Sequence, residues 1–314
     1  CRTVHLRASM KQGTIKADCL LLATAMIWGF AFVAQRVGMD YVGPFTFNAV
    51  RFALGSLSLI PLILLLKKRQ AEPQGRANIS FLKGGLLAGV ALFAGASLQQ
   101  AGLVYTTAGN AGFITGLYVV IVPILGLFWR QRPHAGTWIG AVLAAVGLYF
   151  LSVTDTFTIS FGDLLILIGA FFWAGHVLLI GWLAPQTDSL KLASAQFAIC
   201  SLLSFIMAFI IEVITFEAIW QAAVPILYGG LGSVGIAYTL QVIAQRDAHP
   251  AHSAIILSLE GVFAAIGGWL LLNEILSGRG LFGCALMLAG MIFSEMSVFL
   301  FQKKKASSFN ASSN

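Results

Sequence analysis

Five aromatic or ionisable side chains lie near the middle of long apolar runs that the sequence predicts to cross a membrane. They are Trp28, Tyr118, Trp173, His176 and Glu260. Trp and Tyr usually favour membrane interfaces, and an ionisable group at bilayer depth costs about 2.5 kcal/mol or more, so by default it indicates function. We interpret these residues as the wall of a solute cavity, with Glu260 as its charged or protonatable group. The structural alternative is that the aromatic residues pack between helices and a protonated Glu260 bonds to a neighbouring helix.

Two of the candidate binding residues have open roles. His176 either pairs with Glu260 or is a hydrogen-bonded packing histidine. Arg51, with Asn48 one turn before it, lies inside an apolar run. It either snorkels toward the interface or binds a carboxylate of the substrate or of the protein.

Three further polar residues are expected to line the pathway away from its centre. Gln99 is predicted toward the outer end of its span and Gln241 toward the inner end of its own. Tyr238 and Gln241 are three residues apart, so they share one face of a helix. These side chains either line the two vestibules or make helix–helix hydrogen bonds, which in membranes average about 0.6 kcal/mol.

Other chemistries find little support in the residues. The sequence contains no HExxH, GxSxG, Walker A or GxGxxG element, so we expect neither an enzyme nor a bound cofactor. His249 and His252 have no cysteine or second carboxylate nearby, so no metal site is expected. The formal charge of +7 is dispersed along loops rather than gathered in a basic stripe, which argues against nucleic acid as a partner.

The composition predicts an all-α, polytopic membrane protein. Of the 314 residues, 58% are hydrophobic and only 10% are charged, and the mean hydropathy is +0.88. Apolar runs long enough to cross a bilayer recur along the chain. They predict ten transmembrane helices, over residues 17–36, 44–66, 82–103, 108–129, 135–153, 162–183, 190–212, 222–245, 250–272 and 280–301.

The basic residues predict the orientation. With the N-terminus inside, most of the 19 Lys and Arg residues fall in the cytoplasm, including Lys67-Lys68-Arg69 and Lys303-Lys304-Lys305. Only Arg36 and Arg279 would lie outside, and Arg51 lies within a span. The positive-inside rule therefore places both termini in the cytoplasm.

A weak internal repeat divides the chain into two halves. Trp28 matches Trp173 and Phe52 matches Phe197 at an offset of 145, whereas Tyr118 falls opposite Glu260 at 142. The predicted units are a leader over 1–16, of which 1–9 are doubtful as native sequence, five-helix repeats over 17–153 and 162–301, and a basic, polar tail over 302–314. Because each half holds an odd number of spans, the second half inserts upside-down. Inverted repeats are typical of secondary transporters, whose site lies at the repeat interface.

The chain also resembles a known family. MIWGFAFVAQ with Arg51-Phe52, then GDLLILIGAFFWAGHVLL and LSLEGVFAAIGGWLLLNE, resemble in order the motifs of the EamA family of the drug/metabolite transporter superfamily. The resemblance implies ten helices in two inverted repeats, alternating access and export of amino acids or other small metabolites. Carried over by position, Trp28, Trp173 and Glu260 would line the central cavity.

The expected function is therefore a secondary transporter that exports small metabolites, with a small-molecule substrate and the lipid bilayer as its partners. Glu260 either couples transport to protons or leaves it as facilitated diffusion. Two other functions stay open: a non-transporting scaffold or assembly protein on the same fold, and an uptake permease for a cofactor precursor. The residues do not specify the substrate, the direction of transport or the oligomeric state.

Overall fold

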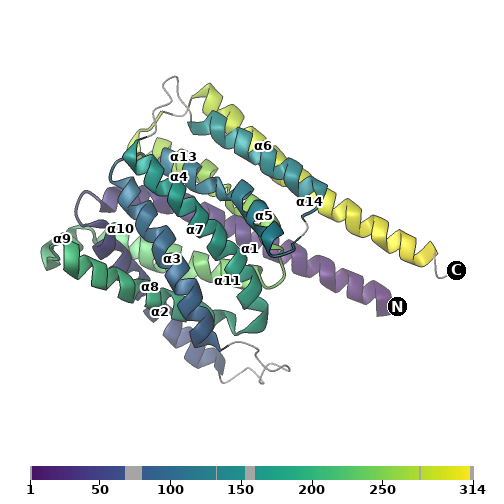
Figure 1. The fold of residues 1–314 in the computed structure, drawn as a ribbon, viewed down its shortest axis with the longest axis horizontal. Helices are drawn as coiled ribbons and strands as arrows, with labels where there is room; N and C mark the ends of the chain where they lie inside the picture. Colours follow the sequence, from purple (N-terminus) through teal and green to yellow (C-terminus); the bar gives the residue numbers. More distant parts are fainter. Residues whose placement is uncertain (1, 68–79, 132, 153–159, 276, 312–314) are drawn as a thin grey trace.

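The computed structural model describes residues 2–67, 80–131, 133–152, 160–275 and 277–311, and these residues form a bundle of helices without any strand (Figure 1). The first half consists of α1 (Arg2–Gly38), α2 (Pro44–Lys67), α3 (Phe81–Leu103), α4 (Ala108–Gly116), α5 (Tyr118–Phe128) and α6 (Ala135–Ser152). The second half consists of α7 (Phe161–Leu183), η1 (Ala184–Gln186), α8 (Ser189–Ile211), α9 (Phe216–Gln221), α10 (Ala223–Leu227), η2 (Tyr228–Tyr238), α11 (Thr239–Ala244), α12 (Pro250–Leu257), α13 (Glu260–Leu272) and α14 (Gly278–Ala311).

Every predicted span coincides with helical structure, but not every helix is long enough to count as a span by itself. Eight segments of the described chain are long and apolar enough to cross a membrane: Ile15–Gly38, Pro44–Leu65, Phe81–Leu103, Ala108–Phe128, Phe161–Gln186, Ser189–Ile211, Ala223–Ala244 and Pro250–Leu272. The apolar parts of α6 and α14, Ala135–Phe150 and Gly278–Ser294, are shorter. The structure therefore establishes the all-helical class, and ten crossings stay a prediction.

The two ends of the chain extend beyond the predicted spans as helix. The start of α1 and the end of α14 project from the same end of the bundle (Figure 1). The predicted basic run 67–69 lies outside the described residues from residue 68 onward. Arg132 and the last three residues of the predicted tail also lie outside them.

Two helices that the repeat relates to each other, α2 and α8, are packed together. The Ser56 hydroxyl donates to the backbone oxygen of Ser194 (3.0 Å), and the Ser201 hydroxyl donates to that of Ala49 (2.8 Å). Between these two contacts, the rings of Phe52 and Phe197 lie 6.3 Å apart. The hydrogen bonds satisfy hydroxyl groups that would otherwise be unpaired in an apolar setting.

A second such pair, α6 and α14, lies side by side along one edge of the bundle (Figure 1). A Cβ atom added at Gly140 would lie 2.8 Å from the backbone oxygen of Gly290, and one at Gly147 would lie 2.6 Å from that of Gly283. Only glycine permits this approach, so these residues let the two backbones come into contact.

Two of the long segments are interrupted near their middle. The first breaks at Leu117, between α4 and α5, and the second breaks at Ser258 and Leu259, between α12 and α13. At the second break the Ser258 hydroxyl turns back to the oxygen of Ile255 (2.8 Å). A third segment widens into the π-helix η2. Interruptions of this kind are frequent at functional sites because they change the direction in which side chains point.

Candidate functional site

A cavity lies where the interrupted helices meet. Eight of the nine candidate residues from the sequence line it: Trp28, Arg51, Gln99, Tyr118, Trp173, Tyr238, Gln241 and Glu260. They come from α1, α2, α3, α5, α7, η2, α11 and α13, so both halves of the chain build the cavity. Whether these residues bind a substrate stays a prediction.

The helix breaks place Tyr118 and Glu260 at equivalent points. Tyr118 is the first residue of α5 and Glu260 is the first residue of α13. Both are buried, and their side chains are close enough to interact. A carboxylate in the first turn of a helix is favoured by the helix dipole, which accounts for the position of Glu260 at the start of α13.

Three aromatic rings form one wall of the cavity. The ring centre of Tyr238 lies 4.5 Å from that of Trp28 and 6.0 Å from that of Trp173. The indole N–H of Trp28 donates to the backbone oxygen of Ser233 in the π-helix (3.3 Å), whereas that of Trp173 has no hydrogen-bond partner. Behind Tyr238 lie the rings of Phe52 and Phe197. The wall is therefore aromatic, and the indole N–H of Trp173 is a donor without a partner.

Arg51 is held in a fixed orientation on α2. Its Nε–H donates to the side-chain oxygen of Asn48 (2.9 Å), and the Asn48 amide donates to the backbone oxygen of Ala96 on α3 (3.1 Å). The guanidinium carbon lies 5.5 Å from the ring centre of Phe47 and 4.9 Å from that of Phe52. The side chain is only 1% exposed, so it does not snorkel toward the interface.

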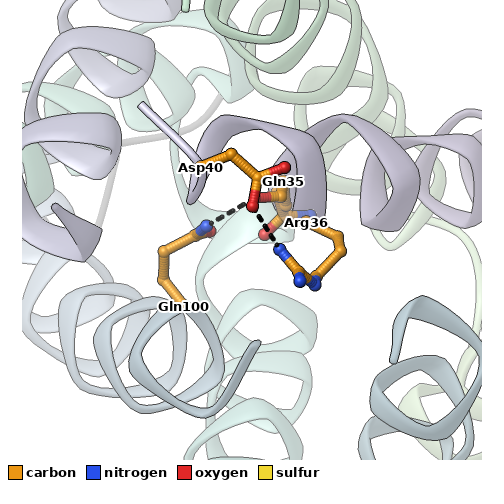
Figure 2. A network of polar contacts seen from close by, with 4 residues as sticks. All are labelled: Gln35, Arg36, Asp40 and Gln100. Atoms are coloured by element: carbon orange, nitrogen blue, oxygen red, sulfur yellow. Dashed lines mark hydrogen bonds and ion pairs between the residues drawn. The ribbon is translucent and has the colours of Figure 1, made fainter. Parts of the chain in front are cut away.

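Amide side chains join three helices at the end of the cavity toward the α1–α2 loop. Thr115 donates to the side-chain oxygen of Gln99 (3.3 Å), and the Gln99 amide donates to that of Gln35 (3.1 Å). The Gln100 amide donates to the backbone oxygen of Gln35 (3.2 Å), beside the ion pair of Arg36 and Asp40 (Figure 2). These bonds tie α1, α3 and α4 together.

The amide toward the other end of the cavity has no such partners. Both side-chain atoms of Gln241 are buried and make no hydrogen bond. One turn later the Gln245 amide donates to the backbone oxygen of Val177 (3.0 Å). Gln99 and Gln241, which the sequence places in corresponding positions, are therefore in different hydrogen-bonding states.

His176 lies outside the cavity, behind Trp173. Its Nε2 is 2.8 Å from the side-chain oxygen of Gln196 on α8, and its ring lies edge-on to those of Trp173 and Tyr238. The structure does not bring His176 to Glu260. Its position favours the packing role among the two that the sequence leaves open.

Five residues that sequence reasoning did not select also line the cavity: Phe32, Gln35, Thr115, Val177 and Ser233. Phe32 and Gln35 follow Trp28 on the same helix face, and Val177 follows Trp173 by one turn. Helical periodicity could have identified these three. Thr115 and Ser233 carry no comparable signal, because their positions depend on the break at Leu117 and on the π-helix.

Several polar atoms at the cavity lack hydrogen-bond partners. They are Nη2 of Arg51, Nε1 of Trp173 and both amide atoms of Gln241. A buried polar group without a partner costs about 1–3 kcal/mol, and native proteins contain few of them. Buried polar atoms without partners also occur elsewhere in the described chain, for example at Thr239, but those at the cavity lie where a polar ligand or water can complete them.

The described residues hold no group of three or more His, Cys, Asp or Glu side chains that could bind a metal ion. His252, which the sequence sets beside His249, instead lies 3.0 Å from the carboxylate of Asp18 on α1. This contact joins α12 to α1 at the end of the bundle opposite the α1–α2 loop.

Comparison with known sequences yields one family. The sequence model of the EamA-like transporter family matches residues 15–153 and again residues 160–296. An uncharacterized transporter of Archaeoglobus fulgidus is 35% identical over 292 residues, which cover 90% of this chain and 86% of that protein. The threonine/homoserine exporter RhtA of Escherichia coli K12 is 27% identical over 285 residues, covering 89% of this chain and 90% of RhtA.

Comparison with solved structures supports the fold. A crystal structure described only as that of a protein superposes with a TM-score of 0.73 at 17% sequence identity. The match covers 89% of this chain and 96% of the other. At this identity the likeness concerns the fold alone.

Proposed function

Because the chain belongs to the EamA-like transporter family, we propose that it is a secondary transporter that exports small metabolites, amino acids among them, by alternating access around the central cavity. The observation that carries this proposal is the cavity itself. It lies at two helix breaks, both halves of the chain line it, and it holds buried polar groups without partners. Discontinuous helices around a midplane site are characteristic of secondary transporters.

Ten spans in two inverted repeats are part of this proposal. The family model matches the chain twice in succession; the first stretch covers five of the predicted spans, and the second covers four and most of the tenth. The contacts between α2 and α8 also support inversion. Ser56 bonds to Ser194, and Ser201 bonds to Ala49. At an offset of 145, Ser56 corresponds to Ser201 and Ala49 to Ser194, so the repeat converts one bond into the other. In this arrangement α6 and α14 are the fifth and tenth spans.

The proposed location is the cytoplasmic membrane, with both termini in the cytoplasm. The chain is a multi-pass membrane protein by its apolar helices and its family. The distribution of Lys and Arg supports the orientation. The α1–α2 loop, and with it the amide network of Gln35, Gln99 and Thr115, then faces the outside.

Amino acids enter the proposal through one relative. RhtA is named for the export of threonine and homoserine, and it matches nearly the whole chain at low identity. The more similar relative from Archaeoglobus names no substrate. The cavity adds that the solute meets aromatic rings together with charged and amide groups.

Counterflow in proteoliposomes tests the proposal. Wild-type protein, Trp28→Ala and Glu260→Gln are each supplied with a labelled mixture of amino acids and other small metabolites. We expect exchange of at least one compound class by the wild type and its loss in both variants, because both residues line the cavity. Trp220→Ala and Glu217→Gln on α9 are matched controls, since both side chains are exposed outside the cavity. No exchange by folded, inserted wild-type protein would favour the non-transporting scaffold.

Proton coupling through Glu260 has a separate test. If Glu260 binds and releases a proton in each cycle, an imposed pH gradient drives net flux in the wild type. The same gradient then has no effect on Glu260→Gln, whose amide cannot exchange a proton. Flux that responds to neither the pH gradient nor the substitution would contradict proton coupling and indicate facilitated diffusion.

A further inference from the structure

Arg51 is a buried cation that forms no ion pair with any described side chain. The ion pairs among the described residues are Arg36–Asp40, Lys191–Asp188 and Asp18–His252, and Arg51 belongs to none of them. Its side chain is 1% exposed. An uncompensated charge in an apolar interior is costly, so such residues usually have a counter-charge nearby.

The carboxylate that shares the cavity does not supply this counter-charge. Glu260 lines the cavity from α13 and makes no ion pair with Arg51 on α2. The ionisable side chains that interact with Arg51 are those of Tyr238 and Cys200, which are neutral in their ordinary state. The described residues therefore place no anion within ion-pair distance of Arg51, and a bound solute can supply one.

The guanidinium group is built to receive such an anion. Asn48 takes the Nε–H, and the rings of Phe47 and Phe52 lie within 5.5 Å and 4.9 Å of its carbon atom. These contacts fix the plane of the group without using Nη2, which has no hydrogen-bond partner. A planar guanidinium matches the two oxygens of a carboxylate, and Nη2 is free to donate to one.

We infer that the transported solute carries a carboxylate group and that Arg51 binds it. This inference rests on the proposed transport function and narrows it, because it excludes amines, sugars and other solutes without an acid group. A single cation matches a single negative charge. A phosphate ester, with nearly two charges, would leave negative charge uncompensated in the cavity that also holds Glu260.

Ligand binding to the purified, detergent-solubilised full-length protein tests the inference without transport. A ligand that binds the folded state raises its unfolding temperature. The first probe is an equimolar mixture of the twenty amino acids with simple mono- and dicarboxylic acids. The second probe replaces every acid in that mixture by its primary amide. We expect the acids to stabilise the protein and the amides to bind at least about ten-fold more weakly, since a site built to bind one polar group rejects an analogue without it.

Variants then assign the effect to Arg51. In Arg51→Gln we expect the acids to lose their advantage over the amides, and in Arg51→Lys we expect part of it to remain. Arg36→Gln is the matched control, because Arg36 pairs with Asp40 and does not line the cavity. Should Arg51→Gln fail to fold, Asn48→Ser is the second variant. It keeps the charge of Arg51 but weakens the hydrogen bond that orients the guanidinium group, so it should reduce the ratio of acid to amide affinity.

The outcomes separate this inference from the proposed function. Equal stabilisation by acids and amides, or no stabilisation by any acid, overturns the inference. An acid preference that survives in folded Arg51→Gln also overturns it. Acids that bind without counterflow would refute transport and leave the carboxylate site standing. Counterflow in which amides compete as well as acids would support transport and overturn the carboxylate site.

Discussion

Two glutamine side chains at opposite ends of the cavity differ in their hydrogen bonding. Gln99 bonds to both Gln35 and Thr115, whereas Gln241 has no partner for either amide atom. The bonded set holds α1, α3 and α4 together on the proposed outer side. In this conformation Gln99 is therefore held by side-chain hydrogen bonds, and Gln241 is not.

The Gln99 network gives a residue-scale prediction. Gln99→Leu removes the partner of Gln35 and of Thr115 at once, so we expect a loss of about 1–3 kcal/mol of stability, the cost of leaving buried polar groups unpaired. Thermal or denaturant unfolding in detergent measures it. Gln186→Leu is the control, because Gln186 bonds only to the backbone oxygen of Trp182, at an exposed position.

A double-mutant cycle checks the mechanism of that loss. Gln35→Leu and Gln99→Leu remove two ends of one hydrogen bond, so their combined effect should be smaller than the sum of the single effects. Strict additivity would show that the amides do not act as a network.

For single residues, the sequence indicated which side chains meet around the cavity, and their role in binding stays a prediction. Eight of the nine candidate residues line one cavity. A polar group in the middle of a span avoids the lipid and therefore faces the interior of the bundle. His176 shows the limit of that rule. Its partner, Gln196, lies on another helix, and no feature of either residue in the sequence identifies the pair.

At the scale of elements, close helix contacts decide where the cavity residues point. A Cβ atom added at Gly29 would collide with Cβ of Phe263 and would lie 2.8 Å from the backbone oxygen of Glu260. The crossing of α1 with α13 therefore fixes the distance between Trp28 and the start of α13. Glycine at this crossing is a requirement of packing rather than of backbone flexibility.

This crossing gives the second prediction. Gly29→Ala forces α1 and α13 apart, so we expect destabilisation of about 1–3 kcal/mol, as for other overpacked contacts, and reduced counterflow. Gly175→Ala on α7 is the matched control, because nothing lies within 4 Å of an added Cβ there. Alanine is the better helix former, so this variant should be as stable as the wild type or slightly more so. Equal losses in both variants would contradict the packing argument.

The interruptions of the helices could not be read from the apolar pattern. The predicted spans over 108–129, 222–245 and 250–272 are continuous apolar runs, yet the structure breaks or widens each of them. Hydropathy reports length and burial, whereas a break depends on the neighbouring helices that accept the freed groups. The repeat alignment did place Tyr118 opposite Glu260, and both residues start the helix after a break.

For the whole molecule, the decisive feature is the pairing of elements that the repeat relates. Gly140 meets Gly290 and Gly147 meets Gly283, and the sequence aligns Gly140 with Gly283 and Gly147 with Gly290 at an offset of 143. Crossed contacts of this kind arise when two equivalent helices pack antiparallel about a two-fold axis. The same pattern joins α2 to α8 through Ser56–Ser194 and Ser201–Ala49. Both pairs favour halves that insert with opposite orientation.

Opposite insertion and ten spans together predict which loops are reached from each side of the membrane. Asp40 lies in the α1–α2 loop and Arg246 lies in the loop after α11, and both are exposed. After the four native cysteines are replaced, a membrane-impermeant maleimide added to intact cells should label Asp40→Cys and not Arg246→Cys. Permeabilised cells should show labelling of both. The reverse pattern would invert the orientation, and labelling of both positions in intact cells would contradict the odd number of crossings, seven, that the ten-span arrangement places between them.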